Sequence, residues 1–361
     1  MIIKSLKIKN FRNYELLDIE FDNATNIFCG NNAQGKTNIL EAIYMSGTTK
    51  SHRGTKDRDM IRFENEESHI ETIVEKRGIP FQIDIHLKKN SPKGIAVNKI
   101  PIKRASELFG IINIVFFSPE DLNIIKNGPS ERRRFMDLEL AQLDKVYLSN
   151  LSNYNRIVNQ RNHLLKDISN KGNLKETLDI WDEQLIHYGN KVIKRREQFI
   201  DEINEIIYNI HNKLTGNKEN LKLGYESNLR HLSFEQALSK YRDRDLRLKS
   251  TTCGPHRDDI NFMVEDLDIR RFGSQGQQRT AALSLKLSEI HLVKKLINDT
   301  PILLLDDVLS ELDKYRQNYL LDSINDIQTL ITCTGLDEFV NHRFSINKVF
   351  RVEQGRVAKE N

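Results

Sequence analysis

The first third of the chain alternates apolar and polar residues with a period of two. This alternation runs through Ile2–Lys9 and Leu16–Phe21, and it returns at Ile70–Glu75, Phe81–Leu87 and Gly94–Val97. A period of two is typical of strands that bury one face. These stretches therefore predict a sheet region that is largely antiparallel.

Two other stretches are apolar without alternation, and they predict strands that are buried on both faces. Ile111–Phe117 ends at Ser118-Pro119, and Ile302–Leu305 ends at two carboxylates. A shorter β-like run, Thr25–Cys29, precedes a helical pattern that continues to about Met45. Together with the alternating strands, these runs predict an α/β fold with a mixed sheet.

The middle of the chain changes to helical periodicity. Apolar residues recur at a spacing of three to four from Leu151 to Ile168 and from Leu174 to Phe199, with turn residues at Ser169–Asn173 between them. Two such helices joined by a short turn are expected to pack as an antiparallel hairpin. Strand character returns at Asp259–Val264, and another helix follows Gln275.

This order predicts a helical arm inserted into an α/β head that both ends of the chain build. We place the head at residues 1–120 and 245–361 and the arm at residues 121–244. A chain of 361 residues is long enough for two such domains.

The amino-acid composition constrains the class of protein only weakly. A hydrophobic fraction of 38% and a charged fraction of 29% are compatible with an ordinary core, and no apolar run is long enough to span a bilayer. The N-terminus has no signal-peptide pattern, so we expect a cytoplasmic protein. The net charge of +4 is a slight indication of a polyanionic partner, and the three cysteines form no metal-binding or disulfide pattern.

The stretch that follows the run Thr25–Cys29 has the pattern of a P-loop. Its glycines allow a tight turn that directs backbone N–H groups and a helix N-terminus at one anion. A lysine in this position lies on the β- and γ-phosphates of a nucleotide, and the following threonine can ligate Mg²⁺. The expected nucleotide-binding residues are Gly30, Asn31, Asn32, Ala33, Gln34, Gly35, Lys36 and Thr37.

A second acidic element fits the same chemistry. Ile302–Leu305 leads into Asp306 and Asp307, which is the pattern of a Walker B strand. Asp306 is expected to hold Mg²⁺ together with Thr37, and Asp307 to orient or deprotonate the attacking water. Lys36 and Asp307 are thus the candidate catalytic residues. A buried strand followed by an acidic turn is the alternative, which the P-loop in the same chain disfavours.

Two further motifs resemble those of ATP-binding-cassette (ABC) ATPases. Gly273–Arg279 opens a helix before the Walker B strand, and Leu309–Asp313 follows that strand in the place of the D-loop. In that class the signature helix contacts the nucleotide of a second subunit. The resemblance implies that Ser274, Gln275 and Gly276 act in trans, with Asp313 in the D-loop, although a Gly/Ser/Gln cluster alone is more often a loop and helix cap.

Three more motifs narrow the resemblance. Lys9–Tyr14, Phe117–Leu122 and Gly254–Asp259 are similar to segments of the bacterial RecF family, the SMC-like ABC-type ATPases of recombinational DNA repair. The similarity extends along essentially the whole chain, including the short arm. It implies an ABC/SMC-like P-loop ATPase head with an inserted helical arm domain.

The resemblance also implies a function that composition and spacing do not show. A RecF-like protein would bind duplex or gapped DNA, form a homodimer on ATP and Mg²⁺, and hydrolyse ATP slowly as a weak, DNA-stimulated switch. It would act in replication and in SOS-linked gap repair, and it would help RecO and RecR to load RecA.

At several positions the chain differs from the residues that most ABC ATPases carry in their motifs. Glu120 stands near the usual glutamine, Thr334 is the polar group nearest the usual switch histidine, and His342 lies too far along the chain to be assumed equivalent. Asp307 stands where many relatives carry glutamate. These departures fit a slow ATPase that acts as a timer.

Several basic residues have two interpretations. Arg12 is either a solvated charge at a strand end or a nucleotide contact, and we favour the contact. Lys50, Arg53, Arg132 and Arg133 are candidates for DNA binding, although the favoured interpretation is a solvated face or pairing within a helix. His256 and Arg257 are as compatible with a structural role as with DNA contact.

Three other functions fit the sequence less well. A transporter ATPase would keep the glutamine and the histidine and would need only a compact helical insert. An SMC-like nuclease partner would need a longer coiled coil, and a fused nuclease would not fit in the residues after Asp313. A small-molecule kinase would not be expected to have the signature and D-loop motifs.

Overall fold

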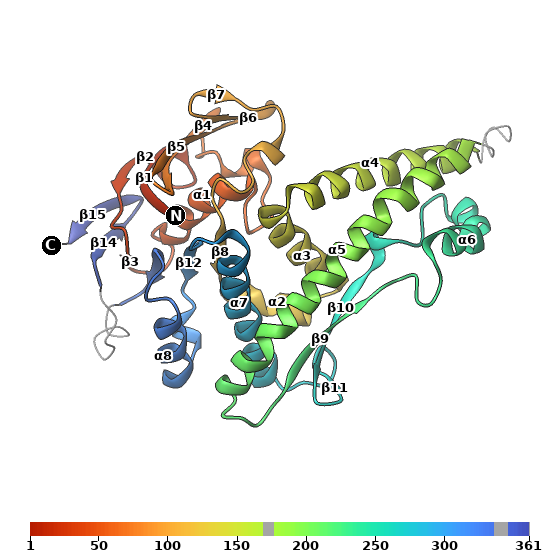
Figure 1. Ribbon diagram of the computed structural model, residues 1–361. Helices are drawn as coiled ribbons and strands as arrows, with labels where there is room; N and C mark the ends of the chain where they lie inside the picture. The colour runs from red at the N-terminus through yellow and green to blue at the C-terminus, as the bar shows by residue number, and fades with distance from the viewer. Residues whose placement is uncertain (169–176, 336–345, 361) are drawn as a thin grey trace. The chain divides into compact units, whose positions relative to one another are not determined.

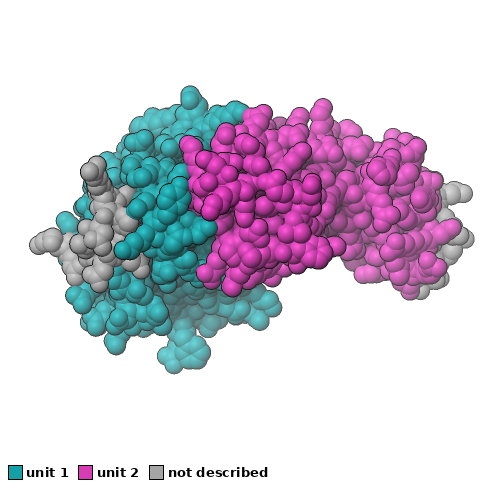
Figure 2. Space-filling view, turned by 90° about the horizontal axis from the view of Figure 1, so that it is seen from below, with its two compact units in different colours: residues 1–121, 286–361 teal, residues 122–285 magenta. Residues whose placement is uncertain are grey.

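The computed structural model describes residues 1–168, 177–335 and 346–360. The chain forms two compact units, which Figure 2 shows in different colours. Unit 1 comprises residues 1–121 and 286–361, and unit 2 comprises residues 122–285. Residues 245–285 thus fall in unit 2 in this division, and their assignment to the ATPase head stays a prediction.

The first sheet of unit 1 is antiparallel and has the strand order β2-β1-β4-β5-β6-β7. Its strands are β1 (Ile2–Phe11), β2 (Tyr14–Glu20), β4 (Glu67–Lys76), β5 (Ile79–Lys88), β6 (Ser91–Val97) and β7 (Ile100–Pro101). Alternate residues are buried along β4, so one face of this strand lies against the core. The five strands predicted from the period of two are therefore confirmed.

The second sheet of unit 1 has the order β15-β14-β3-β13-β12-β8, with β14, β3, β13, β12 and β8 parallel. Its strands are β3 (Thr25–Cys29), β8 (Ile114–Phe117), β12 (Ile302–Asp306), β13 (Thr329–Cys333), β14 (Lys348–Glu353) and β15 (Arg356–Glu360). Every residue of β8 and β12 is buried, as their continuous apolar runs predict, and every residue of β13 is buried as well. β8 begins later than expected because Ile111 lies in a turn and donates its N–H to the carbonyl of Leu108.

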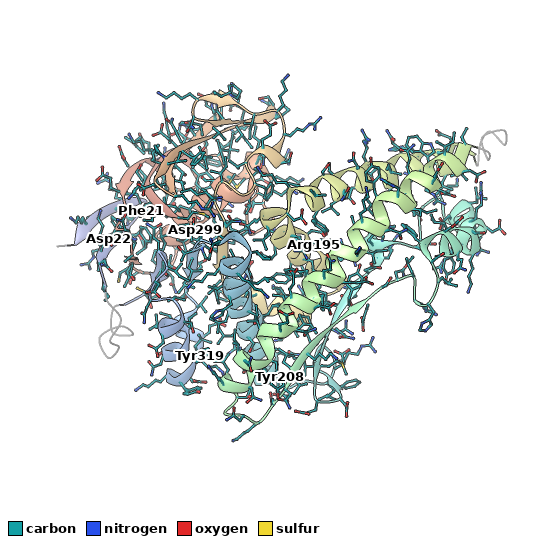
Figure 3. The ribbon with its side chains drawn as sticks, viewed as in Figure 1. Phe21, Asp22, Arg195, Tyr208, Asp299 and Tyr319 are labelled. Carbon is teal, nitrogen blue, oxygen red and sulfur yellow. The ribbon has the colours of Figure 1, made fainter. Side chains whose placement is uncertain are left out.

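Helix α1 (Lys36–Thr48) contacts strands of both sheets and is buried along nearly its whole length (Figure 1). Phe21, labelled in Figure 3, lies in an aromatic cluster with Phe28 of β3 and Phe350 of β14. The rings of Phe28 and Phe350 stack with centroids 5.0 Å apart. This core fixes the strand that leads into the P-loop. Helix α8 (Lys314–Ser323) follows β12.

Unit 2 combines helices with a small antiparallel sheet. Its helices are α2 (Leu122–Lys126), α3 (Pro129–Leu143), α4 (Lys145–Ile168), α5 (Thr177–Leu214) and α6 (Phe234–Leu248). Its strands are β9 (Leu221–Glu226), β10 (Asp259–Val264) and β11 (Leu267–Asp268). Helix α7 (Gln275–Ile297) begins in unit 2 and ends in unit 1. The sequence analysis predicted β10 but not β9, so the arm is not purely helical.

The predicted helical hairpin is formed by α4 and α5, which pack along each other (Figure 1). Leu178, Leu185, Val192 and Phe199 recur every seven residues of α5, and each is at most 1% exposed. This seven-residue spacing confirms the recurrence of apolar residues every three to four positions that the sequence predicts. The turn predicted at residues 169–173 lies outside the described residues.

Ion pairs also join the helices of unit 2. Arg161 of α4 is fully buried and donates to Asp182 of α5 at 2.6 Å and to Asp245 of α6 at 2.7 Å. Arg195 of α5, labelled in Figure 3, donates to Asp144 at 3.2 Å. Because a buried guanidinium needs several acceptors, these carboxylates specify how the helices pack.

Candidate nucleotide-binding site

The P-loop lies between β3 and α1 and is held by the turn that joins β1 and β2. Gly35 caps α1 with φ +113°, and a Cβ there would lie 2.5 Å from the Asn13 side chain. Asn13 donates to the carbonyl of Gln34 at 2.9 Å, and the Tyr14 hydroxyl donates to the carbonyl of Gly35 at 3.1 Å. The Lys9–Tyr14 motif therefore supports the loop from the outside.

Lys36 turns back over this loop. Its Nζ donates to the carbonyl oxygens of Gly30 at 2.5 Å and Asn31 at 2.9 Å. The side chain is nearly buried, so the ammonium depends on these oxygens for solvation. An anion within the loop would meet a positive charge that is already in place.

Asp306 is the last residue of β12 and lies beside the start of α1. Its Oδ1 accepts from the hydroxyl of Thr37 at 2.8 Å and from the hydroxyl of Thr332 at 2.7 Å. Burial raises the pKa of Asp306, and these two hydrogen bonds oppose that rise only in part. The two residues predicted to hold a cation, Thr37 and Asp306, are therefore in direct contact.

Thr332 links the two acidic residues, and the sequence analysis missed it. Its hydroxyl donates to Asp306 and accepts the N–H of Asp307 at 3.0 Å. Asp307 has φ +52°, a left-handed conformation that is uncommon for residues other than glycine, asparagine and aspartate. The register of the parallel strands β12 and β13 would have indicated this role, because Thr332 is the direct partner of Asp306 in that pair.

These groups line one cavity of about 240 Å³. Its walls are P-loop residues 32–37 with Asn38, Arg53, Asp306, Asp307 and Thr332. A second cavity of about 520 Å³ lies along the start of the P-loop, where Gly30, Asn31 and Gln34 are joined by Arg351 and Glu353. The predicted P-loop and acidic residues are thus brought together, with Gln34 on both cavities.

Arg53 lines the smaller cavity, whereas the sequence made it a DNA-binding candidate. Its guanidinium lies 4.0 Å from the Glu41 carboxylate and donates to Asn38 at 3.3 Å. Glu41 is fully buried in α1 and accepts two hydrogen bonds from Arg12, at 2.7 and 2.8 Å. Burial raises the pKa of Glu41. The hydrogen bonds from Arg12 and Ser51 and the charges of Arg12 and Arg53 lower it by more, so the pKa of Glu41 lies below its ordinary value.

Arg12 itself does not line either cavity. Besides Glu41, its guanidinium donates to the Thr55 hydroxyl at 3.0 Å and to the carbonyl of Asp59 at 3.1 Å. In this structure it therefore braces α1 against the segment after it. The nucleotide contact predicted for Arg12 stays a prediction.

The predicted signature residues stand at the exposed N-terminus of α7 in unit 2. Ser274 caps the helix: its Oγ accepts the N–H of Gln277 at 3.2 Å, and its own N–H donates to Gln277 Oε1 at 2.9 Å. Ser274, Gln275 and Gly276 are all exposed. A Cβ on Gly276 would meet no atom closer than 3.9 Å, so the space beside it is open. The helix start can thus be approached from solvent.

The remaining ABC-like positions are placed as follows. Asp313 caps α8 by accepting the N–H of Arg316 at 3.0 Å, and this bond is the main reason why the pKa of Asp313 is lowered. Glu120 is exposed and lines neither cavity, whereas Thr334 lines the larger one. His342 lies outside the described residues.

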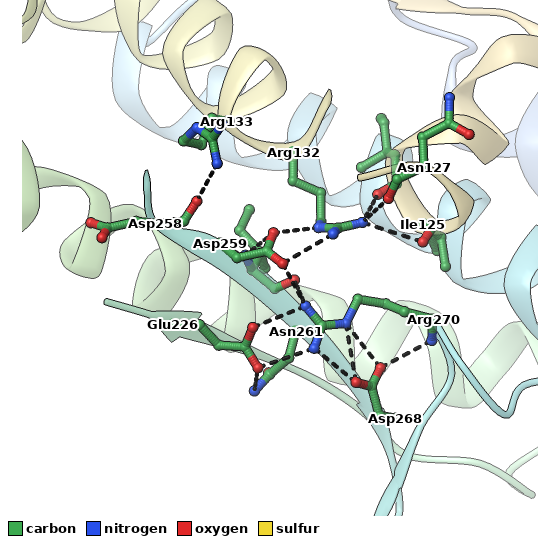
Figure 4. Close-up of polar contacts among 12 residues, drawn as sticks. Ile125, Asn127, Arg132, Arg133, Glu226, Asp258, Asp259, Asn261, Asp268 and Arg270 are labelled. Atoms are coloured by element: carbon green, nitrogen blue, oxygen red, sulfur yellow. Dashed lines mark hydrogen bonds and ion pairs between the residues drawn. The ribbon is translucent and has the colours of Figure 1, made fainter. Parts of the chain in front are cut away.

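One DNA-binding candidate is contradicted by its environment. Arg132 is only 4% exposed, and it donates to both oxygens of Asp259, at 2.5 and 3.0 Å, and to carbonyl oxygens of residues 124, 125 and 127 (Figure 4). With its donors engaged inside unit 2, Arg132 is a structural residue and not a DNA contact. Arg133 donates to the carbonyl of Asp258 at 2.7 Å, and burial lowers its pKa. Lys50 is exposed, and DNA contact by Arg133 and Lys50 stays a prediction.

The Gly254–Asp259 motif has a structural task as well. His256 receives the Tyr154 hydroxyl on Nδ1 at 2.6 Å and donates from Nε2 to the carbonyl of Thr251 at 3.0 Å. Burial lowers the pKa of His256 to about 4, so the ring is neutral near pH 7. Asp258 accepts from the Tyr225 hydroxyl and from the N–H of Asn228. The motif therefore ties α4 to the small sheet, whereas Arg257 is exposed.

Fold and site together define a P-loop ATPase of the ABC type with an SMC-like head. A family model described as "RecF/RecN/SMC N terminal domain" matches residues 2–358. The chain belongs to the RecF family. It is 66% identical to the "DNA replication and repair protein RecF" of Agathobacter rectalis over 99% of each chain, and 62% identical to that of Lachnospira eligens over 100% of each.

Solved structures agree with this assignment. The chain is similar to "the recombination mediator protein RecF-ATP in RecFOR pathway", with 34% identity, a TM-score of 0.93 and coverage of 100% of this chain and 98% of that one. An Smc head domain from Pyrococcus furiosus shares the fold at a TM-score of 0.57 and 16% identity, with coverage of 99% and 96%. Among the described ranges, no helix is both long and apolar enough to cross a bilayer.

Proposed function

We propose that this protein binds ATP and acts in DNA replication and repair, where ATP closes two copies into a dimer on DNA and slow hydrolysis opens it. One observation carries the proposal: P-loop residues 32–37, Asp306, Asp307 and Thr332 surround one cavity. Similarity to RecF proteins along the whole chain, and to a RecF structure described with ATP, supports this function.

The cavity residues fit a nucleotide with Mg²⁺. Oxygen ligands at adjacent corners of an octahedral Mg²⁺ site lie about 3 Å apart, since each is about 2.1 Å from the ion. The Thr37 hydroxyl and the Asp306 carboxylate are 2.8 Å apart and are both hard oxygen ligands. When bound, the ion would neutralise charge on the phosphates. Lys36 would exchange the carbonyls of Gly30 and Asn31 for phosphate oxygens.

The same residues account for slow turnover. Asp307 is the candidate base for the attacking water, and Thr332 holds its backbone in place through the N–H bond. An aspartate is shorter than the glutamate of many relatives, and Glu120 is not among the residues that line the cavity. We therefore expect a weak ATPase, stimulated by DNA, that acts as a switch and not for metabolic turnover.

Hydrolysis requires a second copy in this proposal. The first turn of α7 offers the Ser274 hydroxyl and the helix N-terminus, both of which favour an anion. In the dimer, Ser274, Gln275 and Gly276 would meet the terminal phosphate that the partner's P-loop holds. The dimer would open once that phosphate leaves.

The remaining parts of the proposal follow from the family. RecF relatives carry the name of a replication and repair protein, and one solved relative is described as a recombination mediator in the RecFOR pathway. We extend this to the present chain as binding to duplex or gapped DNA in the cytoplasm, with RecO and RecR, in support of RecA loading. Lys50, Arg53 and Arg133 remain candidates for the DNA contact.

Sedimentation velocity tests the proposal. Wild type is compared with Lys36→Ala and Ser274→Arg in ATP, in ADP and without nucleotide, each with and without duplex DNA. Ser239→Arg, which adds the same side chain at an exposed position of α6, is the matched control. Only wild type and the control should dimerise, and only with ATP. A dimer that forms without ATP, or one that Ser274→Arg leaves intact, would reject the proposal.

A further inference from the structure

The capping residue Gln277 is itself held by a carboxylate from another element. Its side-chain oxygen accepts the N–H of Ser274, and its side-chain nitrogen donates to Oε1 of Glu219 at 3.0 Å. Glu219 lies in the loop between α5 and β9. Because only the NH₂ end of an amide donates to a carboxylate, Glu219 fixes which end of Gln277 faces Ser274.

A histidine at the end of α5 lies beside Glu219 and contacts α7 as well. His211 is fully buried, and its Nε2 lies 3.5 Å from Oε2 of Glu219. Its Nδ1 is 2.9 Å from the Ser284 hydroxyl, which donates its own hydrogen to the carbonyl of Thr280 at 2.8 Å. Nδ1 must therefore be the donor to Ser284. His211 thus joins the last turn of α5 to α7 through Ser284, and its ring lies beside Glu219.

These contacts brace the start of α7 from two places. Ser284 lies farther along α7 and contacts the last turn of α5 through His211, and Gln277 contacts the loop after α5 through Glu219. All of these residues belong to unit 2. The first turns of α7 are therefore attached to the C-terminal end of the long arm helix.

The chemistry at Ser274 depends on this arrangement. The Ser274 oxygen accepts the N–H of Gln277, so its own hydrogen points elsewhere and can be donated. An amide of Gln277 that rotates freely would compete for that hydrogen through its oxygen. Holding Gln277 keeps the serine ready to donate to an anion outside the helix.

We propose that Glu219 is a positioning residue for the signature serine. It orients the Gln277 side chain so that Ser274 presents its hydroxyl hydrogen to the terminal phosphate bound by a second copy of this chain. This inference rests on the proposed function. It assigns the α5–β9 loop to the composite site, although no residue of that loop touches the nucleotide.

The test compares Glu219→Ala with Glu219→Gln. Alanine removes the acceptor of Gln277, whereas glutamine retains an oxygen that can accept the same hydrogen. Glu265→Ala is the matched control, because Glu265 accepts from Asn220 in the same loop at 3.2 Å and does not contact Gln277. ATP-dependent dimerisation should weaken about tenfold in Glu219→Ala and by less than about twofold in the other two variants.

Two more measurements separate positioning from damage. The affinity of the monomer for a fluorescent ATP analogue, measured below the dimerisation range, should be unchanged in all three variants. Hydrogen exchange at the Ser274 amide should be about fivefold faster in Glu219→Ala than in wild type, even without nucleotide.

The outcomes distinguish the two proposals. If wild type does not dimerise with ATP, the proposed function fails, and the exchange measurement still decides whether Glu219 holds Ser274. If wild type dimerises and Glu219→Ala does so equally well, the positioning role is rejected. Equal losses in Glu219→Ala and Glu265→Ala would also reject it, because the integrity of the loop would then be the cause.

Discussion

Replacing the buried carboxylate of Glu41 by an amide tests how the structure supports the P-loop helix. In Glu41→Gln the side chain keeps its shape and loses its charge. The wild-type carboxylate accepts two hydrogen bonds from Arg12, at 2.7 and 2.8 Å, and one from Ser51 at 2.5 Å. The amide can satisfy only part of this set, since its NH₂ end faces donors.

The expected cost lies between two limits. Breaking a fully buried ion pair costs about 3–5 kcal/mol, and an exposed pair contributes at most about 1 kcal/mol. Glu41 is fully buried, but the Arg12 side chain is 18% exposed and can be partly hydrated once it is released. We therefore expect the opening free energy of α1 to fall by about 2–3 kcal/mol.

The pH dependence follows from the lowered pKa of Glu41. A carboxylate whose folded pKa is depressed contributes stability above its unfolded pKa of about 4.3 and loses it as pH falls through the folded value. The difference between wild type and Glu41→Gln should thus be the same at pH 6 and pH 8.

Native-state hydrogen exchange, read by mass spectrometry on α1 peptides, measures this opening free energy directly. Asp57→Asn is the control, since Asp57 is 38% exposed and its pair with Lys93 should contribute less than about 0.5 kcal/mol. A loss below about 0.5 kcal/mol in Glu41→Gln would refute the argument, as would a loss that disappears between pH 8 and pH 6.

Three other substitutions give separate tests. Thr332→Val removes the bond to the Asp307 N–H, so ATP turnover should fall about tenfold while the affinity for a fluorescent ATP analogue changes less than about threefold. Lys50→Ala should lower the slope of log DNA affinity against log salt concentration by about 0.9. Arg132→Ala should leave that slope unchanged. It should instead destabilise unit 2 by about 3 kcal/mol in denaturant melts, because it breaks a buried ion pair. Folded His256 stays neutral while the unfolded chain takes up a proton, so this group destabilises the fold as pH falls. In denaturant melts the stability of wild type relative to His256→Gln should fall by about 1–2 kcal/mol between pH 7 and pH 5.

Sequence patterns predicted the strands and the P-loop well because each rests on local chemistry. The period of two in β4 and the continuous apolar runs of β8 and β12 report burial directly. The P-loop depends on glycines and a lysine at fixed spacing, so its backbone geometry can be predicted from these residue types. The heptad in α5 likewise reports the face packed in unit 2.

The errors arose where a role depends on contacts between distant segments. Arg132 belongs to a run of three arginines, which predicts solvent-exposed side chains. Only the fold places Asp259 beside Arg132. Thr332 gains its role from the register of two parallel strands, which the residue types alone do not reveal. Strand β9 was missed because its short alternation lies inside a long helical region.

A mixing experiment with two inactive variants tests the composite site most directly. Lys36→Ala lacks a working P-loop but keeps the signature, and Ser274→Arg has the opposite defect. Neither variant alone should hydrolyse ATP, while an equimolar mixture should recover activity, because a mixed dimer contains one complete site. Recovery should rise with total protein concentration and remain below half of the wild-type rate. Two folded variants that stay inactive when mixed, or a Ser274→Arg protein that is fully active alone, would contradict the account.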